Sequence, residues 1–288
     1  MVELSDGTLL WTAVSGDGPP LLLCHGGPGL WDYLAPLAAL LDDVFTVIRF
    51  DQRGCGRSTD RGGGRFTIEQ AVNDLEQLRA ALGVDHWGVV GHSWGAELAL
   101  RYAAHFPDRV TGVVYVAGVG AGDGFRDGYV SERERRLGAD LPRWMELGSR
   151  QRNPAEEREW CLLQWRPDFS PGPAAIEHAA ALWATRPPHV GVNTAAYRQL
   201  WADRDTVDLL TLAADLRRPV TMLLGSDDPR PWQATDSLFV ALPAGNRIVF
   251  SAAGHAPWAE QPSAIRAAIL TAFATVPGPS RRPPRQAC

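Results

Sequence analysis

Lysine is absent from this sequence, in which all 28 basic residues are arginine. Without a lysine amine, mechanisms that use a Schiff base or a lysine nucleophile are excluded. Cysteine is scarce, and the four cysteines stand far apart and form no Cys-x-x-Cys pair. The sequence therefore indicates neither a zinc site nor a dithiol redox motif.

Long apolar runs and an excess of basic charge are missing as well. No apolar run is long enough to cross a bilayer, and the first residues lack the basic and apolar regions of a secretory signal peptide. The formal net charge is -5, which argues against nucleic acid or a membrane as partner because both attract a basic surface. We therefore expect a cytoplasmic protein with reduced thiols.

What the chain has is an alternation of short apolar runs and helix-like segments. The apolar runs are typical of strands buried on both faces of a parallel sheet, and the segments between them carry apolar residues at three- and four-residue steps. We expect strands at residues 8–14, 21–24, 44–50, 87–90, 110–116, 219–224 and 247–250. We expect helices at residues 31–41, 66–82, 97–106, 231–242 and 262–273. The alternation predicts an α/β fold with a mostly parallel sheet flanked by helices.

The strand pattern stops in the middle third of the chain, where arginine, alanine and tryptophan are frequent. Residues 121–215 contain only helical patterns, so we expect a helical cap inserted between strands of one core. Residues 1–120 would form the first part of that core and residues 216–276 the second, followed at 277–288 by a proline- and arginine-rich tail expected to be disordered. Such a cap would cover the carboxyl ends of the strands, where ligands bind in open α/β sheets.

A serine between two glycines stands where an expected strand meets an expected helix. The segment Gly-His-Ser-Trp-Gly at residues 91–95 fits the sharp turn that exposes a nucleophilic serine, here Ser93. Alone the pattern is weak, because Ser93 could simply cap the helix. Asp228 and His255 each follow a later strand, and the chain order Ser, Asp, His is that of the α/β-hydrolase arrangement. The three residues therefore predict a catalytic triad of nucleophile, acid and base.

Two further choices concern the acid and the oxyanion site. Asp227 competes with Asp228 as the acid, and we favour Asp228 because it stands three residues after the glycine that ends the strand. The oxyanion of an acyl-transfer intermediate needs N–H donors, which we expect from the backbone of Trp94 and of Gly27. His25 and His92 flank these two loops, and we expect them to be structural hydrogen-bonding residues rather than bases.

At this point the sequence resembles the proline iminopeptidase-like branch of the α/β hydrolases, the serine peptidases of S33 type. The matching motifs are HGGPG at 25–29, DQRGCGRS at 51–58, GHSWG at 91–95, GSDDP at 225–229 and AGHAPWAEQP at 253–262. The resemblance implies an α/β-hydrolase fold, Ser93 as nucleophile, Asp228 as acid and His255 as base, with the Gly27 and Trp94 amides as oxyanion hole. It also implies no metal and no organic cofactor.

The resemblance makes the cap the place where the substrate is chosen. In proline iminopeptidases, glutamates from the cap hold the free amine of the substrate, within a recurring tryptophan-tryptophan-glutamate pattern. Here Trp183 is followed by Ala-Thr-Arg-Pro, without that glutamate. The candidate substrate-binding residues are Trp160, Trp165, Trp183 and Glu159.

Three functions follow from the sequence. The first is a serine hydrolase that releases N-terminal proline or another small residue from a short peptide or amide. The alternative is an esterase, lactonase or amidase that acts on a small hydrophobic metabolite, which would suit a tryptophan-rich cap. A remote third is a non-catalytic ligand-binding protein on the same scaffold. The oligomeric state is not predicted.

Overall fold

The sheet at the centre of the computed structural model has seven strands, and residues 1–204 and 209–274 of the chain are described. Its strand order is β3-β5-β4-β6-β7-β8-β9, in which β3 runs antiparallel to β5 and every other pair is parallel. β1 and β2 form a separate antiparallel pair. The strands are β1 Val2–Glu3, β2 Leu9–Leu10, β3 Thr12–Ser15, β4 Pro20–Cys24, β5 Thr46–Phe50, β6 Trp87–His92, β7 Val110–Val116, β8 Val220–Gly225 and β9 Gly245–Phe250. The predicted α/β fold with a mostly parallel sheet is confirmed.

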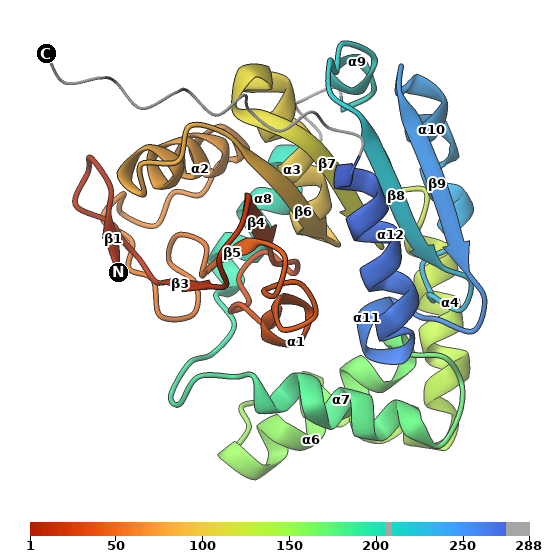
Figure 1. The fold of residues 1–288 in the computed structure, drawn as a ribbon. Coiled ribbons are helices and arrows are strands. Elements are labelled where there is room, and N and C mark those ends of the chain that lie inside the picture. Colours follow the sequence, from red (N-terminus) through yellow and green to blue (C-terminus); the bar gives the residue numbers. More distant parts are fainter. Residues whose placement is uncertain (205–208, 275–288) are drawn as a thin grey trace, which may run out of the picture.

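Helices cover both faces of this sheet, which is why its central strands are apolar on both sides (Figure 1). Along β4, Leu22 and Cys24 pack into the core on one face, and Leu21 and Leu23 pack into the core on the other. The first core is completed by α2, α3, α9 and α10, and the second by α1, α11 and α12. The helices that flank the core are α1 Ala35–Ala38, α2 Ile68–Ala81, α3 Trp94–His105, α9 Leu209–Ala214, α10 Asp236–Ala241, α11 Pro257–Glu260 and α12 Pro262–Ala274.

Several expected elements differ from the observed ones in their bounds. The helix expected at 31–41 is reduced to α1, because Pro36 lies at its first turn and fits only there. The strand expected at 8–14 is split at Trp11, whose N–H donates to the Ser58 hydroxyl instead of to a strand. The helix expected from residue 97 already begins at Trp94 in α3.

Between β7 and β8, the regular elements of the described residues are helices. These are α4 Arg126–Leu137, α5 Leu141–Gly148, α6 Pro154–Trp165, α7 Ala174–Ala184, α8 Thr194–Asp203 and α9, with the short 3-10 turns η2 Gly138–Asp140 and η3 Arg166–Asp168. In Figure 1, α6 and α7 lie below the sheet as a layer apart from the core helices.

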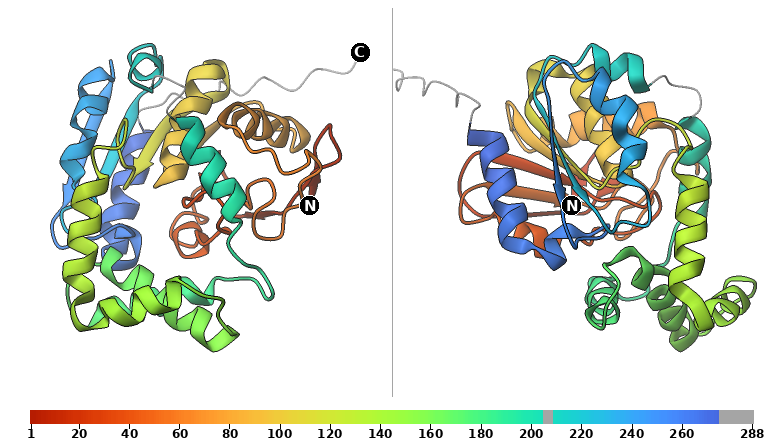
Figure 2. Two further views of the ribbon diagram at one scale, coloured as in Figure 1. Left: turned by 180° about the vertical axis from the view of Figure 1, so that it is seen from behind. Right: turned by 90° about the vertical axis from the view of Figure 1, so that its right-hand side faces the viewer.

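The end of this segment returns to the core. In α8, Ala196 and Leu200 belong to the core cluster of α2 and α3, and α9 packs against α3 and α10. Figure 2 shows α8 running back from the cap layer toward the core helices. Of the helices expected as cap at 121–215, α8 and α9 therefore also cover the sheet, and the name cap is used below for the segment from α4 to α7. The expected tail at 277–288 lies outside the described residues. No helix in the described ranges has the length and apolar character that a membrane crossing requires.

Candidate active site

Ser93 occupies a strained turn between β6 and α3. Its φ of 55° and ψ of −120° lie where residues other than glycine are rare. A Cβ at Gly91 would stand 2.1 Å from the carbonyl oxygen of Gly95, and a Cβ at Gly95 would stand 2.2 Å from that of Cys24. Both glycines are therefore required by close backbone approach, and the Ser93 N–H is held by the Val116 carbonyl at 2.9 Å.

His255 and Asp228 meet in the loops that follow β9 and β8. Nδ1 of His255 lies 2.6 Å from Oδ2 of Asp228, and both side chains are nearly buried. Burial would raise the pKa of Asp228, but the neighbouring His255 and Arg230 outweigh it and hold the pKa of this carboxyl below its ordinary value. Asp227 instead accepts a hydrogen bond from the Ser226 hydroxyl at 3.0 Å. The geometry thus joins Asp228, and not Asp227, to the histidine.

Ser93 and His255 face one cavity of about 120 Å³ between the core and the cap. The residues that line it are Gly27, Leu30, Tyr33, His92, Ser93, Gln164, Trp165, Asp168, Phe169, Leu182, Arg230, His255 and Ala256. Within the described residues, the Ser93 hydroxyl forms no hydrogen bond with His255. Hydrogen bonds of this kind are often long before substrate binds.

The loop after β4 lies directly against the nucleophile. A Cβ at Gly26 would stand 2.7 Å from Cβ of Ser93, so only glycine allows this approach. Gly27 follows with a φ of +52° and lines the cavity. Trp94 is the first residue of α3, and an N–H at this position has no acceptor within its own helix. The two expected oxyanion donors therefore belong to segments beside Ser93, Gly27 in the loop after β4 and Trp94 at the start of α3.

A hydrogen-bond chain ties these loops to the loop of His255. The Gly26 N–H donates to the Tyr33 hydroxyl at 2.8 Å, and that hydroxyl lies 2.6 Å from Nδ1 of His92. Nε2 of His92 lies 2.7 Å from the carbonyl oxygen of His255. Because a carbonyl only accepts, Nε2 of His92 carries the proton and Nδ1 accepts from Tyr33. Burial, and next the nearby His255, lowers the pKa of His92 well below its ordinary value. The ring therefore stays neutral, in this tautomer.

The imidazole ring of His25 is also held in its neutral form. The Gln52 N–H donates to its Nε2 at 3.1 Å, so Nδ1 carries the proton and donates to the Gly26 carbonyl at 2.9 Å. Burial lowers the pKa of His25. Both histidines thus hydrogen-bond to backbone groups of the site's loops, in line with the structural role expected of them.

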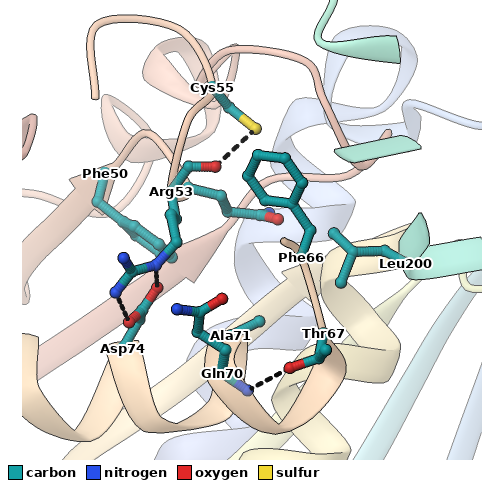
Figure 3. Close-up of a pocket in the computed structure, with 10 residues that line it drawn as sticks. Phe50, Arg53, Cys55, Phe66, Thr67, Gln70, Ala71, Asp74 and Leu200 are labelled. Atoms are coloured by element: carbon teal, nitrogen blue, oxygen red, sulfur yellow. Dashed lines mark hydrogen bonds and ion pairs between the residues drawn. The ribbon is translucent and has the colours of Figure 1, made fainter. Parts of the chain in front are cut away.

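The motif at 51–58 forms a scaffold behind this loop. The side chain of Gln52 donates to the His25 carbonyl at 2.8 Å and accepts from the Trp94 indole at 3.3 Å. Its neighbour Arg53 points the other way and binds both carboxylate oxygens of Asp74 in α2, at 2.8 and 2.6 Å (Figure 3). The small hollow drawn there is therefore bordered by a buried ion pair, and Ser93 does not line it.

Two charged residues that line the cavity were not predicted from the sequence as site residues. Asp168 lies in η3 of the cap, and Arg230 lies two residues after Asp228. Nη1 of Arg230 donates to Asp168 at 2.9 Å and to Asp228 at 3.3 Å. Arg230 shares the loop of the acid and could have been noticed for that reason. Asp168 stands in a proline-bounded turn that carries no signal of its own.

The cap and the histidine loop are also joined through their backbones. The His255 N–H donates to the Asp168 carbonyl at 2.6 Å. The carboxylate of Glu260 accepts from the Gly254 N–H at 2.6 Å and from the Ser170 N–H at 2.8 Å. The position of His255 thus depends on the cap turn at 166–170.

Of the four candidate substrate-binding residues, Trp165 is among the residues that line the cavity. Trp183 packs against the ring of Trp165, with 6.3 Å between the ring centroids, and does not itself line the cavity. Trp160 stacks with Arg152, and Glu159 forms an ion pair with Arg143 at the surface, at 2.7 Å. The structure does not bring Trp160, Trp183 or Glu159 to the cavity wall, because their side chains are used for packing and pairing within the cap.

The α/β-hydrolase fold family model matches residues 19–262, which is most of the chain. This chain belongs to the α/β-hydrolase family. The family predicted from the sequence motifs is therefore confirmed. No group of three or more His, Cys, Asp or Glu residues within 1–204 and 209–274 is arranged to hold a metal ion.

Relatives of this α/β hydrolase bear different names. It is 29% identical over 262 residues to RutD of Escherichia coli O9:H4 (strain HS), provisionally named a carbamate hydrolase, which covers 90% of this chain and 93% of that protein. It is 39% identical over 116 residues to a proline iminopeptidase of Arabidopsis thaliana, covering 39% of this chain and 30% of that one. The crystal structure of proline iminopeptidase from Mycobacterium smegmatis matches with a TM-score of 0.70 and 22% identity, over 95% of this chain and 96% of that one, which shows a shared fold.

Proposed function

We propose that this α/β hydrolase is a serine hydrolase that works through an acyl-enzyme. The observation that carries the proposal is the 2.6 Å contact between His255 and Asp228 at a cavity that Ser93 also lines. A carboxylate at Nδ1 keeps the proton on that nitrogen and leaves Nε2 free to accept one from a serine hydroxyl. The strained turn of Ser93 supports the same reading, because such strain persists where a side chain must be presented.

In the proposed mechanism, the Ser93 hydroxyl oxygen attacks the substrate carbonyl while His255 takes its proton. The N–H groups of Gly27 and Trp94 stabilise the oxyanion, and each such donor is worth about 3 kcal/mol of transition-state stabilisation. His255 then protonates the leaving group as the tetrahedral intermediate collapses to an ester on Ser93. A water molecule, deprotonated by His255, releases the acid by the same steps in reverse order.

The cavity wall favours an uncharged substrate. The apolar wall consists of Leu30, Trp165, Phe169, Leu182 and Ala256. A peptidase for free N-termini must bind an ammonium group, and the Asp168 carboxylate in this wall lies beside the positive charge of Arg230, which opposes that binding. We therefore place hydrolysis of a small uncharged ester, lactone or amide first. The provisional name of the RutD relative, a hydrolase of carbamates, is compatible with this choice.

Release of N-terminal proline or another small residue, the first function expected from the sequence, becomes the second candidate. It is supported by the five motifs shared with the iminopeptidase-like branch and by the partial match to the Arabidopsis thaliana enzyme. The cavity volume of about 120 Å³ is small beside the sites that hold drug-sized ligands. Either substrate would therefore have a small acyl group. A non-catalytic role is the least favoured, since a binding protein has no need of the Asp228–His255 contact.

Parallel assays of two substrate panels separate these candidates. We expect the wild-type enzyme to hydrolyse p-nitrophenyl esters of short acids, and the Ser93→Ala variant to lose this activity by a factor of about 10⁴ or more. We expect arylamides of free amino acids, proline included, to be cleaved poorly. Efficient cleavage of a prolyl arylamide would move the iminopeptidase to first place. Full ester hydrolysis by Ser93→Ala would reject the nucleophile.

A further inference from the structure

Asp168 and Arg230 form a charged corner in the wall of the cavity. Both side chains are largely buried, with 13% and 14% of their surface exposed. The guanidinium is fixed on one face by the ring of Tyr129 in α4, at 4.1 Å from the ring centroid. Tyr129 in turn accepts from the Gln164 amide at 3.2 Å. The corner is therefore held by contacts from several sides and is built from the cap and the acid loop together.

Part of the hydrogen-bonding capacity of this corner is unused within the protein. The Arg230 guanidinium donates through Nη1, to Asp168 and Asp228. Asp168 accepts through Oδ1, and within the described residues neither its Oδ2 nor Nε and Nη2 of Arg230 has a hydrogen-bond partner. None of these three atoms is among the buried polar atoms without a partner in the described ranges, so solvent reaches them. The corner thus offers N–H donors beside one carboxylate acceptor.

We propose that the Asp168–Arg230 pair is a specificity site that selects substrates carrying an uncharged group able to donate and accept hydrogen bonds at once, such as a carboxamide, carbamate or ureido group. The carbonyl oxygen of that group accepts from the free edge of Arg230, and its N–H donates to Oδ2 of Asp168. This inference rests on the proposed function, because it places that group in the cavity of Ser93.

The alternatives fit the corner less well. A carboxylate would meet the Arg230 donors but would also meet the negative charge of Asp168. An ammonium group would meet Asp168 but would lie against the guanidinium. An alkyl group would leave the donors and the acceptor without partners after water is expelled, and sites built to hydrogen-bond a group reject an analogue lacking it by large factors. The pair therefore discriminates by charge and by hydrogen bonding together.

The test uses p-nitrophenyl esters whose acyl chain ends, after one to three methylene groups, in a carboxamide, a carboxylate or an isopropyl group. Each rate is corrected for spontaneous hydrolysis. In the wild-type enzyme we expect kcat/KM for the best carboxamide to exceed that of its isopropyl and carboxylate counterparts at least tenfold. Equal values for the three end groups, with ester hydrolysis still dependent on Ser93, would overturn the inference and leave the proposed function standing. Absence of any Ser93-dependent hydrolysis would overturn both.

Two variants change the corner in opposite ways. Asp168→Asn keeps the oxygen that faces Arg230 and replaces Oδ2 by an NH₂ donor, so the ratio of carboxamide to carboxylate kcat/KM should fall at least tenfold. Arg230→Lys keeps the charge between the two carboxylates but removes the planar donor edge, so the ratio of carboxamide to isopropyl kcat/KM should fall toward one. Unchanged ratios in both variants would overturn the inference.

The matched control is Asp140→Asn, which removes another cap carboxylate paired with arginine. Asp140 contacts Arg166 at 2.7 Å and does not line the cavity. Both ratios should stay at their wild-type values in this variant. A fall in the control equal to that in Asp168→Asn would assign the effect to the cap as a whole and overturn the specificity site.

Discussion

The residues of the proposed chemistry lie in turns and loops at one edge of the sheet. Which contacts each residue makes depends on its exact position in the loop. Asp228 and Asp227 are neighbours of the same type, yet only Asp228 reaches the ring of His255, while Asp227 is held by Ser226. This makes the pair a natural comparison for the role of the acid.

Replacing Asp228 with asparagine should lower kcat for ester hydrolysis by about four orders of magnitude, because the amide stabilises the wrong tautomer of the histidine. Asp227→Asn should leave kcat within about twofold of the wild-type value. Steady-state kinetics on one p-nitrophenyl ester measure both. Loss of activity in Asp227→Asn, with Asp228→Asn active, would move the acid to the other carboxylate.

At this scale, the sequence predicts the residues whose signals are local. Ser93 lies between glycines at a strand end, and His255 follows a glycine, so pattern and position agree. Asp168 and Arg230 lie 62 residues apart and meet only because the η3 turn packs on the loops of β8 and β9. Nothing in the local sequence of either residue encodes that meeting. The role of Trp160 and Glu159 could not be predicted for the same reason, since each is occupied by an arginine of another part of the cap.

Among the elements, α3 and α8 are joined by a buried ionic contact. Glu97 in α3 accepts from Arg101 one turn later at 2.6 Å and from Arg204, the residue after α8, at 2.5 Å. All three side chains are at most 4% exposed. Arg204 also donates to the Gly120 carbonyl at 3.1 Å. This contact fastens the end of α8 to the helix that follows the nucleophile.

Glu97→Ala should destabilise the protein by about 3–5 kcal/mol, because it removes the buried carboxylate that two buried guanidinium groups share. Urea unfolding followed by tryptophan fluorescence measures the change. The matched control is Glu159→Ala, which removes an exposed partner of Arg143 and should leave the unfolding midpoint unchanged. Equal unfolding midpoints for Glu97→Ala and the wild-type protein would contradict the account of α8.

The positions of helices and strands were predictable where the local pattern of apolar residues decides them. The apolar runs of β4 and β7 and the stepwise pattern of α2 give the expected elements with small shifts at the ends. The helix expected at 31–41 fails because Pro36 has no N–H for a helix interior. The return of α8 and α9 to the core was not predictable, since their apolar faces would equally suit a cap.

Across the whole molecule, two buried histidines are held uncharged by their surroundings. Burial lowers the pKa of His25, and burial together with His255 lowers that of His92 further. The unfolded chain binds protons on these residues below about pH 6.5, while the folded chain binds them only at a lower pH. The contribution of the two histidines to the free energy of unfolding is therefore fully present above that pH and is lost as the pH decreases below it.

Each such histidine can make the free energy of unfolding fall by up to about 1.4 kcal/mol per pH unit. We expect the fall between pH 6.5 and 5 to be shallower in His92→Gln than in the wild-type protein, because one of the two contributions is gone. Urea denaturation at a series of pH values measures both slopes. Parallel curves for the two proteins would contradict a neutral His92.

Labelling by a fluorophosphonate, followed by peptide mass mapping, tests the central claim most directly. The probe reacts only with a serine whose hydroxyl is activated by a base. If Ser93 is the nucleophile of a triad with His255 and Asp228, the wild-type protein is labelled at Ser93, and His255→Ala is labelled far more slowly. Labelling of another residue, or no labelling of a folded protein that hydrolyses esters, would contradict the account.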